Sequence, residues 1–302
     1  MTTIGVWAFH DSGLTGLDLS EATSLVEIGD GAFYGTSLAG ALVIPAKVSM
    51  IGNGAFQLTK LTGLDLSKAT SLEEIGDDAF SYATDLAGTL MIPANVTMIG
   101  SSAFQETKIM GLDLSKATSL VEIWDSAFLG IDLLQGTLVI PANVRSIADC
   151  AFQYTKLTSL DLSKATSLVE IGSRAFFETG LQGTLVIPSK VATIGDFAFE
   201  ATKLTGLDLS KATSLVEIGD HAFYKTGLAG MLVVPAAVRI IGDSAFYGTN
   251  LTGRVDLSKA TSIMSIGNAA FSDTEIREIL WPGTEITEML WPSESSQRSA
   301  VY

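Results

Sequence analysis

Apolar residues recur along this chain with a period near 24 residues. The dipeptide Ala-Phe marks the period twelve times, with its Phe at positions 9, 33, 56, 80, 104, 128, 152, 176, 199, 223, 246 and 271. Two kinds of segment alternate between the marks. One reads LDLSKATSLVEIG, identically at 160–172 and 207–219, and the other contains AGTLVIP or a close variant. Repetition at a fixed period predicts a repeat solenoid in place of separate globular domains.

Each repeat opens with a predicted strand. In LTGLDL the last apolar residues alternate with polar ones, which is typical of a half-buried strand. In the other repeat type a proline follows the strand and ends it, because proline cannot donate to a ladder. These prolines are Pro45, Pro93, Pro141, Pro188 and Pro235. The next segment has apolar residues three apart, such as Leu25 and Ile28. It is predicted to be an irregular return segment, which reverses the chain direction and buries these side chains on a second side of the core.

The segment around Ala-Phe is predicted to be a short helical turn. The residue two before Ala is Asp, Asn or Ser in every repeat except the first, which has Val6. Short polar side chains of this kind accept hydrogen bonds from free backbone N–H groups at a helix start. The apolar surface that one repeat can bury is too small to offset the entropy lost when its backbone becomes ordered. Each repeat therefore needs its neighbours in order to fold.

Composition narrows the class of partner. The chain has 302 residues, a net charge of −15 and a 47% hydrophobic content, which together indicate a folded chain with an acidic surface. Such a surface repels phosphate groups, so nucleic acid and anionic membranes are poor partners. The only cysteine is Cys150. No signal peptide, membrane-spanning run, phosphate-binding loop or zinc motif is recognised, and no cofactor or metal is expected.

The phrases IPAKVSMIGNGAF (44–56) and IPANVTMIGSSAF (92–104) resemble the BspA-type leucine-rich repeat, over nearly all of residues 1–272. The resemblance implies a leucine-rich-repeat solenoid of about twelve repeats, with a parallel β-sheet on one face. It also implies adhesion or protein binding without catalysis, often at the surface of bacteria or protists. Cell-surface or extracellular localisation is therefore expected, although no signal peptide is visible.

The chain departs from the family pattern at two kinds of position. Alanine stands where the usual repeat has asparagine, at Ala22, Ala69, Ala117, Ala165, Ala212 and Ala260. Threonine takes positions near the usual cysteine after Phe, at Thr36, Thr59, Thr84 and Thr107. These changes leave the predicted fold intact but do not identify a particular partner.

Three regions are predicted. Residues 1–272 form the solenoid, which starts midway through a repeat without an N-terminal cap. Residues 273–292 form degenerate capping strands from the related phrases TEIREILWP and TEITEMLWP, and residues 293–302 form a polar tail. The missing cap suggests a fragment, or assembly in which another segment or subunit covers the open N-terminal end.

One polar pattern stands out as a candidate binding site. The outward strand position is Asp in one repeat type and Val or Met in the other, which predicts an acid-striped sheet face. Evenly spaced strands would place neighbouring Asp side chains about 9.5 Å apart, too far to share Ca²⁺. Alternatively, the face is merely solvated and neutralised by Lys68, Lys116, Lys164, Lys211 and Lys259. The predicted binding residues are Asp18, Asp65, Asp113, Asp161, Asp208, Asp256, Val43, Met91, Val139, Val186 and Val233.

Other candidates are weaker. Threonines recur near the strands and raise a remote alternative, an ice- or mineral-binding surface; they are Thr62, Thr89, Thr137, Thr158, Thr184, Thr205 and Thr252. His10, His221 and Cys150 occupy variable slots without partner motifs, and we expect structural roles for them. Trp281 and Trp291 are expected to plug the core. The leading hypothesis is a non-enzymatic protein-binding scaffold, and the alternative is a structural module that docks into a larger assembly.

Overall fold

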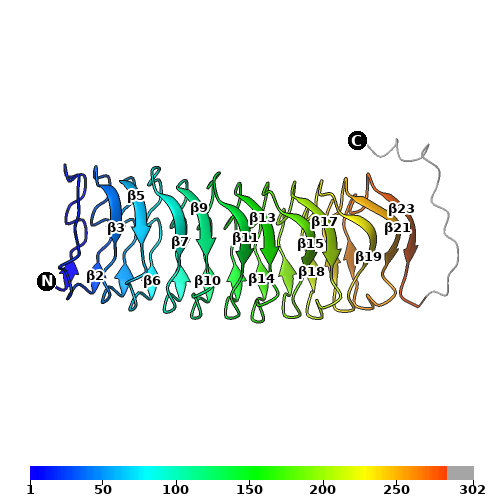
Figure 1. Ribbon diagram of the computed structural model, residues 1–302. Helices are drawn as coiled ribbons and strands as arrows, with labels where there is room; N and C mark the ends of the chain where they lie inside the picture. The colour runs from blue at the N-terminus through cyan, green and yellow to red at the C-terminus, as the bar shows by residue number, and fades with distance from the viewer. Residues whose placement is uncertain (284–302) are drawn as a thin grey trace.

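The computed structural model describes residues 1–283 as an elongated stack of similar turns (Figure 1). Twelve two-residue strands, one from each turn, form a continuous parallel sheet along the stack. They are β1 Thr3–Ile4, β2 Glu27–Ile28, β4 Met50–Ile51, β6 Glu74–Ile75, β8 Met98–Ile99, β10 Glu122–Ile123, β12 Ser146–Ile147, β14 Glu170–Ile171, β16 Thr193–Ile194, β18 Glu217–Ile218, β20 Ile240–Ile241 and β22 Ser265–Ile266. The predicted solenoid of about twelve repeats is confirmed, and its return segment contributes a sheet of its own.

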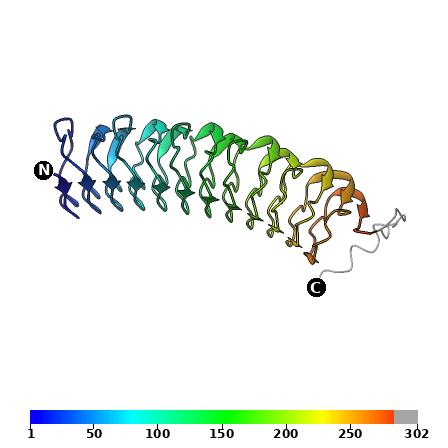
Figure 2. The same ribbon diagram turned by 90° about the horizontal axis from the view of Figure 1, so that it is seen from below.

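Longer parallel strands line another side of the stack, at the positions predicted for strands. They are β3 Ala39–Val43, β5 Lys60–Asp65, β7 Ala87–Met91, β9 Lys108–Asp113, β11 Gln135–Val139, β13 Lys156–Asp161, β15 Gln182–Val186, β17 Lys203–Asp208, β19 Ala229–Val233, β21 Asn250–Asp256 and β23 Glu275–Leu280. They hydrogen-bond in pairs, β3–β5, β7–β9, β11–β13 and β15–β17, and in one group of three, β19–β21–β23. The stack is gently curved with the longer strands on its outer side (Figure 2), where neighbouring turns diverge.

The core is a column of identical layers. The twelve Ala-Phe phenylalanines stack face to face, with adjacent ring centroids 5.2–5.5 Å apart and planes within 10° of parallel. The ten from Phe33 to Phe246 are fully buried. Alanines at five of the six positions that lack the family's asparagine are also buried, at Ala69, Ala117, Ala165, Ala212 and Ala260.

The prediction of a short helical turn at Ala-Phe is wrong, because residues 1–283 contain no helix. Each Ala-Phe segment is a run of tight turns with two left-handed residues, such as Arg174 (φ 55°) and Glu178 (φ 52°). A left-handed residue changes the direction of the peptide group that follows it. Some backbone N–H groups of the turn therefore bond to the next repeat, and the N–H groups do not all point along one helix axis. The N–H of Phe33 donates to the carbonyl of Ala55 at 2.8 Å, whereas that of Ala32 donates within its own turn to Gly29.

At eight of these positions the Asp or Asn before the turn does accept a backbone N–H, but from the next repeat. The donor is the equivalent residue there, as for Asn53 N–H to Asp30 Oδ1 at 2.8 Å. Eight such bonds of 2.6–3.1 Å occur among the described residues. The predicted caps are therefore rungs of a ladder that joins repeats.

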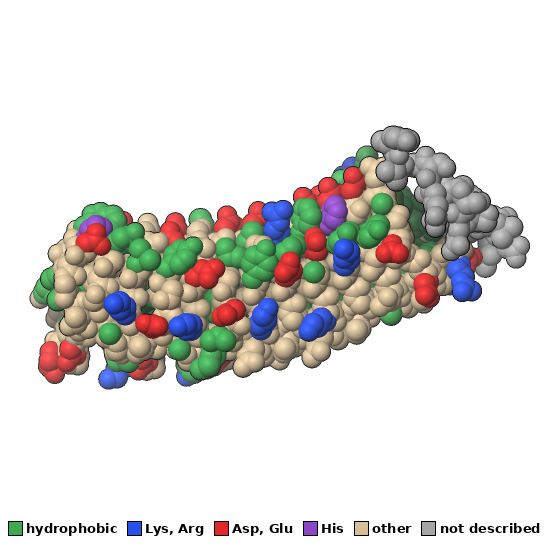
Figure 3. Space-filling view, turned by 90° about the horizontal axis from the view of Figure 1, so that it is seen from above, with side chains coloured by type: hydrophobic (Ala, Val, Ile, Leu, Met, Phe, Trp, Pro, Cys, Tyr) green, Lys and Arg blue, Asp and Glu red, His purple; other side chains and the backbone are tan. Residues whose placement is uncertain are grey.

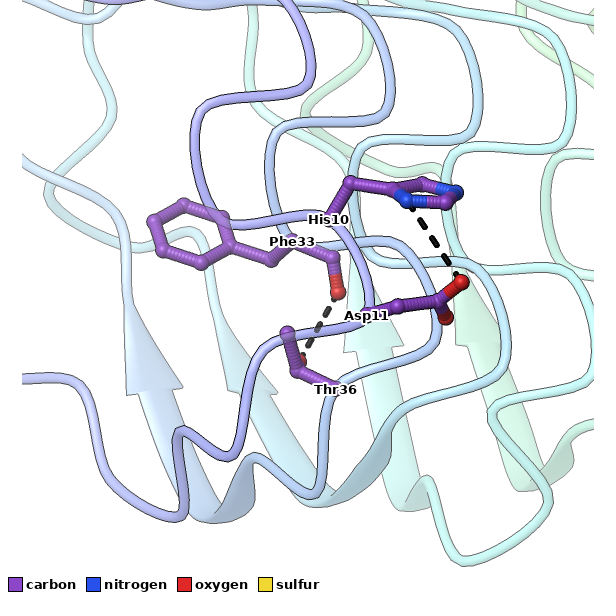
Figure 4. Close-up of polar contacts among 4 residues, drawn as sticks. All are labelled: His10, Asp11, Phe33 and Thr36. Atoms are coloured by element: carbon purple, nitrogen blue, oxygen red, sulfur yellow. Dashed lines mark hydrogen bonds and ion pairs between the residues drawn. The ribbon is translucent and has the colours of Figure 1, made fainter.

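Most threonines near the expected cysteine positions tie each turn to its own phenylalanine. The hydroxyl of Thr36 donates to the carbonyl of Phe33 at 2.8 Å (Figure 4), and Thr59 and Thr107 repeat the bond. Thr84 does not, because Ala83 fills this buried position in its repeat.

At the C-terminal end, β23 pairs with β21 and extends the outer strands beyond residue 272. This is the first of the two expected capping strands. The second, with Trp291, and the polar tail lie outside the described residues, so the predicted division at 272 and 292 stays a prediction.

Candidate binding face

Each aspartate of the predicted row follows the same local design. It ends an outer strand, or in the first repeat the equivalent segment, and its Oδ1 accepts the N–H of the serine two residues on at 2.8–2.9 Å. This hydrogen bond forms an Asx turn, which ends the strand and changes the direction of the chain. The row aspartates therefore have a structural role that the sequence pattern did not reveal.

The row lies beside the apolar residues in register. The strand pairs place Val43 beside Asp65 and Met91 beside Asp113. The same register holds for Val139 and Asp161, Val186 and Asp208, and Val233 and Asp256. Val43, Met91, Val186 and Val233 are 37–39% exposed, and Val139 is half-buried. The structure thus brings the predicted acidic and apolar residues together on one face.

The serine turns lower the pKa of the row carboxylates. Hydrogen bonding by Ser67 lowers the pKa of Asp65, and the nearby Lys68 charge lowers it less. The same causes lower the pKa of Asp113, Asp161 and Asp208, while hydrogen bonding by their serines lowers that of Asp18 and Asp256. Within residues 1–283 no lysine forms an ion pair with a row aspartate; the pairs present are His10–Asp11 (Figure 4) and Lys108–Asp85. The carboxylates are thus free to meet an external cation.

Grooves lie between neighbouring strand pairs at two places, a feature that the assumption of evenly spaced strands missed. One, of about 740 Å³, has Asp113 and Ser115 from one pair and Val139 and Asn143 from the next along its walls, with Lys164. A second, of about 750 Å³, repeats the arrangement one pair further on with Asp161 and Val186. Each groove offers a carboxylate and an apolar wall to a ligand.

The threonines do not form one flat array. A β-bulge follows Gly136, so Thr137 lies opposite Ser159 and Thr158 is left out of the register. The same bulge recurs at Gly40, Gly88, Gly183 and near Gly230. Threonines of paired strands are therefore out of register, and the ice- or mineral-binding surface stays a prediction.

The two histidines and the cysteine lie at the Ala-Phe turns, away from the aspartate row. His10 stacks on Tyr34 with centroids 5.0 Å apart, and His221 stacks on Phe197 at 4.8 Å. Burial raises the pKa of the Cys150 thiol, which opposes a reactive thiolate. The sequence analysis considered these three residues one at a time. It did not recognise that the variable positions of successive Ala-Phe turns lie next to one another along the stack.

Metal-binding clusters and membrane-spanning helices are both absent from residues 1–283. Among residues 1–283, no three His, Cys, Asp or Glu side chains are grouped so that they could hold a metal ion. The same part of the chain has no helix with the length and apolar character to span a membrane. Trp281, expected to plug the core, is partly buried and packs against it.

Comparison with known proteins identifies the repeats. The family described as BspA type leucine rich repeat region (6 copies) matches residues 2–135, 121–252 and 216–290. No curated protein matches the sequence.

Three solved structures illustrate the structural likeness. A leucine-rich repeat protein from Bacteroides ovatus is 20% identical, with a TM-score of 0.43, covering 84% of this chain and 78% of its own. The pneumococcal vaccine antigen PcpA is 21% identical, with a TM-score of 0.49, covering 92% and 74%. A leucine rich cell surface protein from Faecalibacterium prausnitzii is 22% identical, with a TM-score of 0.49, covering 94% and 84%.

Proposed function

The chain belongs to the BspA-type leucine-rich repeat family, and from that premise we propose that it is a non-enzymatic scaffold that binds a protein partner through the aspartate row and its apolar neighbours. Proteins of this family are typically surface adhesion or protein-binding proteins, which supports a cell-surface or extracellular setting. The partner would be a protein surface that offers basic and apolar side chains together.

One observation carries this proposal. Five exposed or half-buried Val or Met side chains lie in register beside five carboxylates along the outer strands. Alternating charge and apolar surface supports both steering of a basic partner and burial of its apolar groups.

The test compares two variants of equal net charge. One changes the six row aspartates to asparagine, whose side-chain oxygen still accepts the serine N–H. The other changes six acids elsewhere to glutamine; these are Glu27, Glu73, Glu74, Glu122, Glu170 and Glu217. Both variants and the original chain serve as bait for a surface extract of the source organism, and the purified partner is then titrated against each.

We expect the partner's affinity to fall at least about tenfold in the row variant and to stay near the original in the glutamine variant. A row variant that binds as the original chain does would refute the site. Equal losses in both variants would indicate general charge attraction.

The alternative, a structural module, rests on the first turn. Val6, Trp7 and Phe9 are 59%, 53% and 42% exposed, whereas the equivalent Phe33 is buried. Docking of another repeat on this turn would cover them. Sedimentation of the original chain and of a Trp7→Ser/Phe9→Ser variant tests this alternative: association with rising concentration, lost in the variant, supports it, and a monomer at all concentrations contradicts it.

A further inference from the structure

Variation between repeats is concentrated in three slots of the Ala-Phe turn. The LDLSKATSLVEIG segments repeat closely and the segments after proline vary at a few positions, but the residue before Ala and the two after Phe change constantly. Successive turns read RAFFE, FAFEA, HAFYK and SAFYG from Arg174, Phe197, His221 and Ser244. The repeats stack alike whatever fills these slots, so stacking does not dictate their identity.

These slots hold most of the unusual residue types in the chain. They contain both phenylalanines outside the core stack, Phe177 and Phe197, both histidines and Cys150. They also contain five of the six tyrosines, namely Tyr34, Tyr82, Tyr154, Tyr224 and Tyr247. Aromatic residues are enriched where proteins bind one another.

The backbone conformation of two of these slots does not favour bulky side chains. The slot before Ala and the second slot after Phe are left-handed in all twelve turns. Glycine suits that conformation and stands in the second slot at Gly35, Gly130 and Gly248, whereas Tyr154 (φ 63°) occupies it with a bulky side chain. Bulky residues in this conformation are strained, and strained residues cluster at functional sites.

In the C-terminal half the slots form one continuous surface, which we call the aromatic strip: Tyr154, Phe177, Phe197, His221, Tyr224 and Tyr247. Tyr154 meets Phe177 edge to face at 5.6 Å, and Tyr224 stacks on Tyr247 at 5.1 Å. The two histidines, in purple, lie along the upper edge in Figure 3, among hydrophobic and acidic side chains.

The aromatic strip already holds two cations of its own chain. The Arg174 guanidinium lies over the Phe197 ring, 4.7 Å from the ring centroid, and the Lys225 ammonium lies 5.0 Å from that of Tyr224. The strip ends beside small residues, since Gly130 precedes Tyr154 in the same slot and Ser272 follows Tyr247. Within residues 1–283, the only ring that Tyr154 contacts is that of Phe177, and the only ring that Tyr247 contacts is that of Tyr224.

Carboxylates accompany the rings. Glu178 is exposed beside the strip, and Glu106 reaches across Gly130 toward the repeat of Tyr154. Glu200 has a buried carboxylate oxygen without a hydrogen-bond donor in the described structure. A guanidinium or ammonium group satisfies both a ring face and an acceptor of this kind.

We propose that the aromatic strip is a second binding surface, which takes an arginine- and lysine-rich segment of a protein partner. Basic side chains of that segment lie over the rings of Tyr154 and Tyr247 and pair with Glu106, Glu178 and Glu200. This surface is separate from the aspartate row, and the proposal does not depend on binding there.

The probe is a fluorescein-labelled nona-arginine peptide, titrated at 150 mM salt and followed by fluorescence anisotropy. The strip variant carries Tyr154→Ser, Phe177→Ser, Tyr224→Ser and Tyr247→Ser. Its matched control carries Val26→Ser, Leu133→Ser, Val169→Ser and Met264→Ser, four exposed apolar residues outside both proposed surfaces, so both keep the full net charge. A third protein carries asparagine at the six row aspartates.

We expect the strip variant to bind at least about tenfold more weakly and the matched control to stay within about twofold of the original chain. If the strip variant does not fold, Tyr154→Ser with Glu178→Gln replaces it, with an expected loss of about threefold. Absence of binding by the original chain, or equal binding by strip variant and control, overturns the proposal. Loss confined to the asparagine variant also overturns it and assigns the peptide to the aspartate row.

Discussion

Asp149 and Ser173 occupy the same position in consecutive repeats, and the Asp149 Oδ1 accepts the backbone N–H of Ser173 at 2.6 Å. Ser173 donates in this bond, but within residues 1–283 its own hydroxyl does not accept the N–H of Asp196, the next equivalent residue. Ser101 interrupts the ladder before Asp125 in the same way. The shorter serine side chain does not reach the following N–H, so the ladder is broken at its two serines.

Replacing Ser173 by aspartate should restore the missing rung. Its carboxylate would accept the Asp196 N–H, and we expect the free energy of unfolding to rise by about 0.5–1.5 kcal/mol. Urea unfolding followed by circular dichroism measures the change. Ser173→Ala is the control and should alter stability little, because the serine hydroxyl makes no bond to Asp196; a similar gain from both substitutions would exclude the ladder as its cause.

The ladder shows where sequence reasoning succeeded and where it could not. The sequence predicts that the short polar side chains at Asp30 and its equivalents accept backbone N–H groups, which is right at eight Asp and Asn positions and wrong at Ser101 and Ser173. Their donors were placed in the same turn, because a capped helix and an inter-repeat rung need the same residue types. The deciding feature is a left-handed backbone at positions such as Ser126 and Arg174, and their side chains give no sign of it.

The phenylalanine column should be most sensitive at its centre. Phe152 is fully buried between Phe128 and Phe176, so Phe152→Ala should cost about 3–5 kcal/mol of unfolding free energy. Phe9 is 42% exposed and stacks on one ring only, and Phe9→Ala should cost clearly less. Urea titrations of both variants test the contrast; equal costs would mean that stacking across repeats does not determine the sensitivity.

Glu178 should be a site where glycine stabilises the chain. Its φ of 52° is left-handed, and its backbone N–H bonds to the Glu200 carbonyl whatever the side chain. Glu178→Gly should therefore raise the unfolding free energy by about 0.5–1 kcal/mol, whereas Glu178→Ala keeps the strain and should not. Thermal unfolding of the pair measures the difference, and an equal effect of both would indicate relief of charge repulsion from Glu200.

The candidate face was only partly predictable. Alternation along the strand placed Asp65 and Val43 on one outward surface, because side chains of a strand alternate between faces. Even spacing of the strands did not follow from the sequence. Gly40 and its equivalents introduce bulges, and the outer side of a curved stack diverges, so the strands separate into pairs with grooves between them.

Acid should destabilise the fold through the aspartate row. The pKa of all six carboxylates is lowered in the folded state, first of all by hydrogen bonding from serine, as at Asp161. A carboxylate with a lowered folded pKa contributes stability that is fully present above its unfolded pKa of about 3.9 and is lost as pH falls through the folded value. Burial raises the pKa of Asp78 and Glu200, so these two carboxylates oppose folding when they are ionised. As pH falls they become protonated before the row aspartates do, and this unfavourable contribution to folding then disappears. We expect stability to hold down to about pH 4 and then to fall steeply.

Urea midpoints measured from pH 6 to pH 2.5 test whether the row causes this loss of stability at low pH. The variant with asparagine at the six row positions keeps the acceptor for each serine N–H but has no carboxylate to protonate, so its stability should fall less below pH 4. The variant with glutamine at six acids elsewhere, none of which accepts a serine N–H in an Asx turn, should follow the original chain. If stability falls as steeply below pH 4 in the asparagine variant as in the original chain, the acid sensitivity arises outside the row and the serine turns are not its cause.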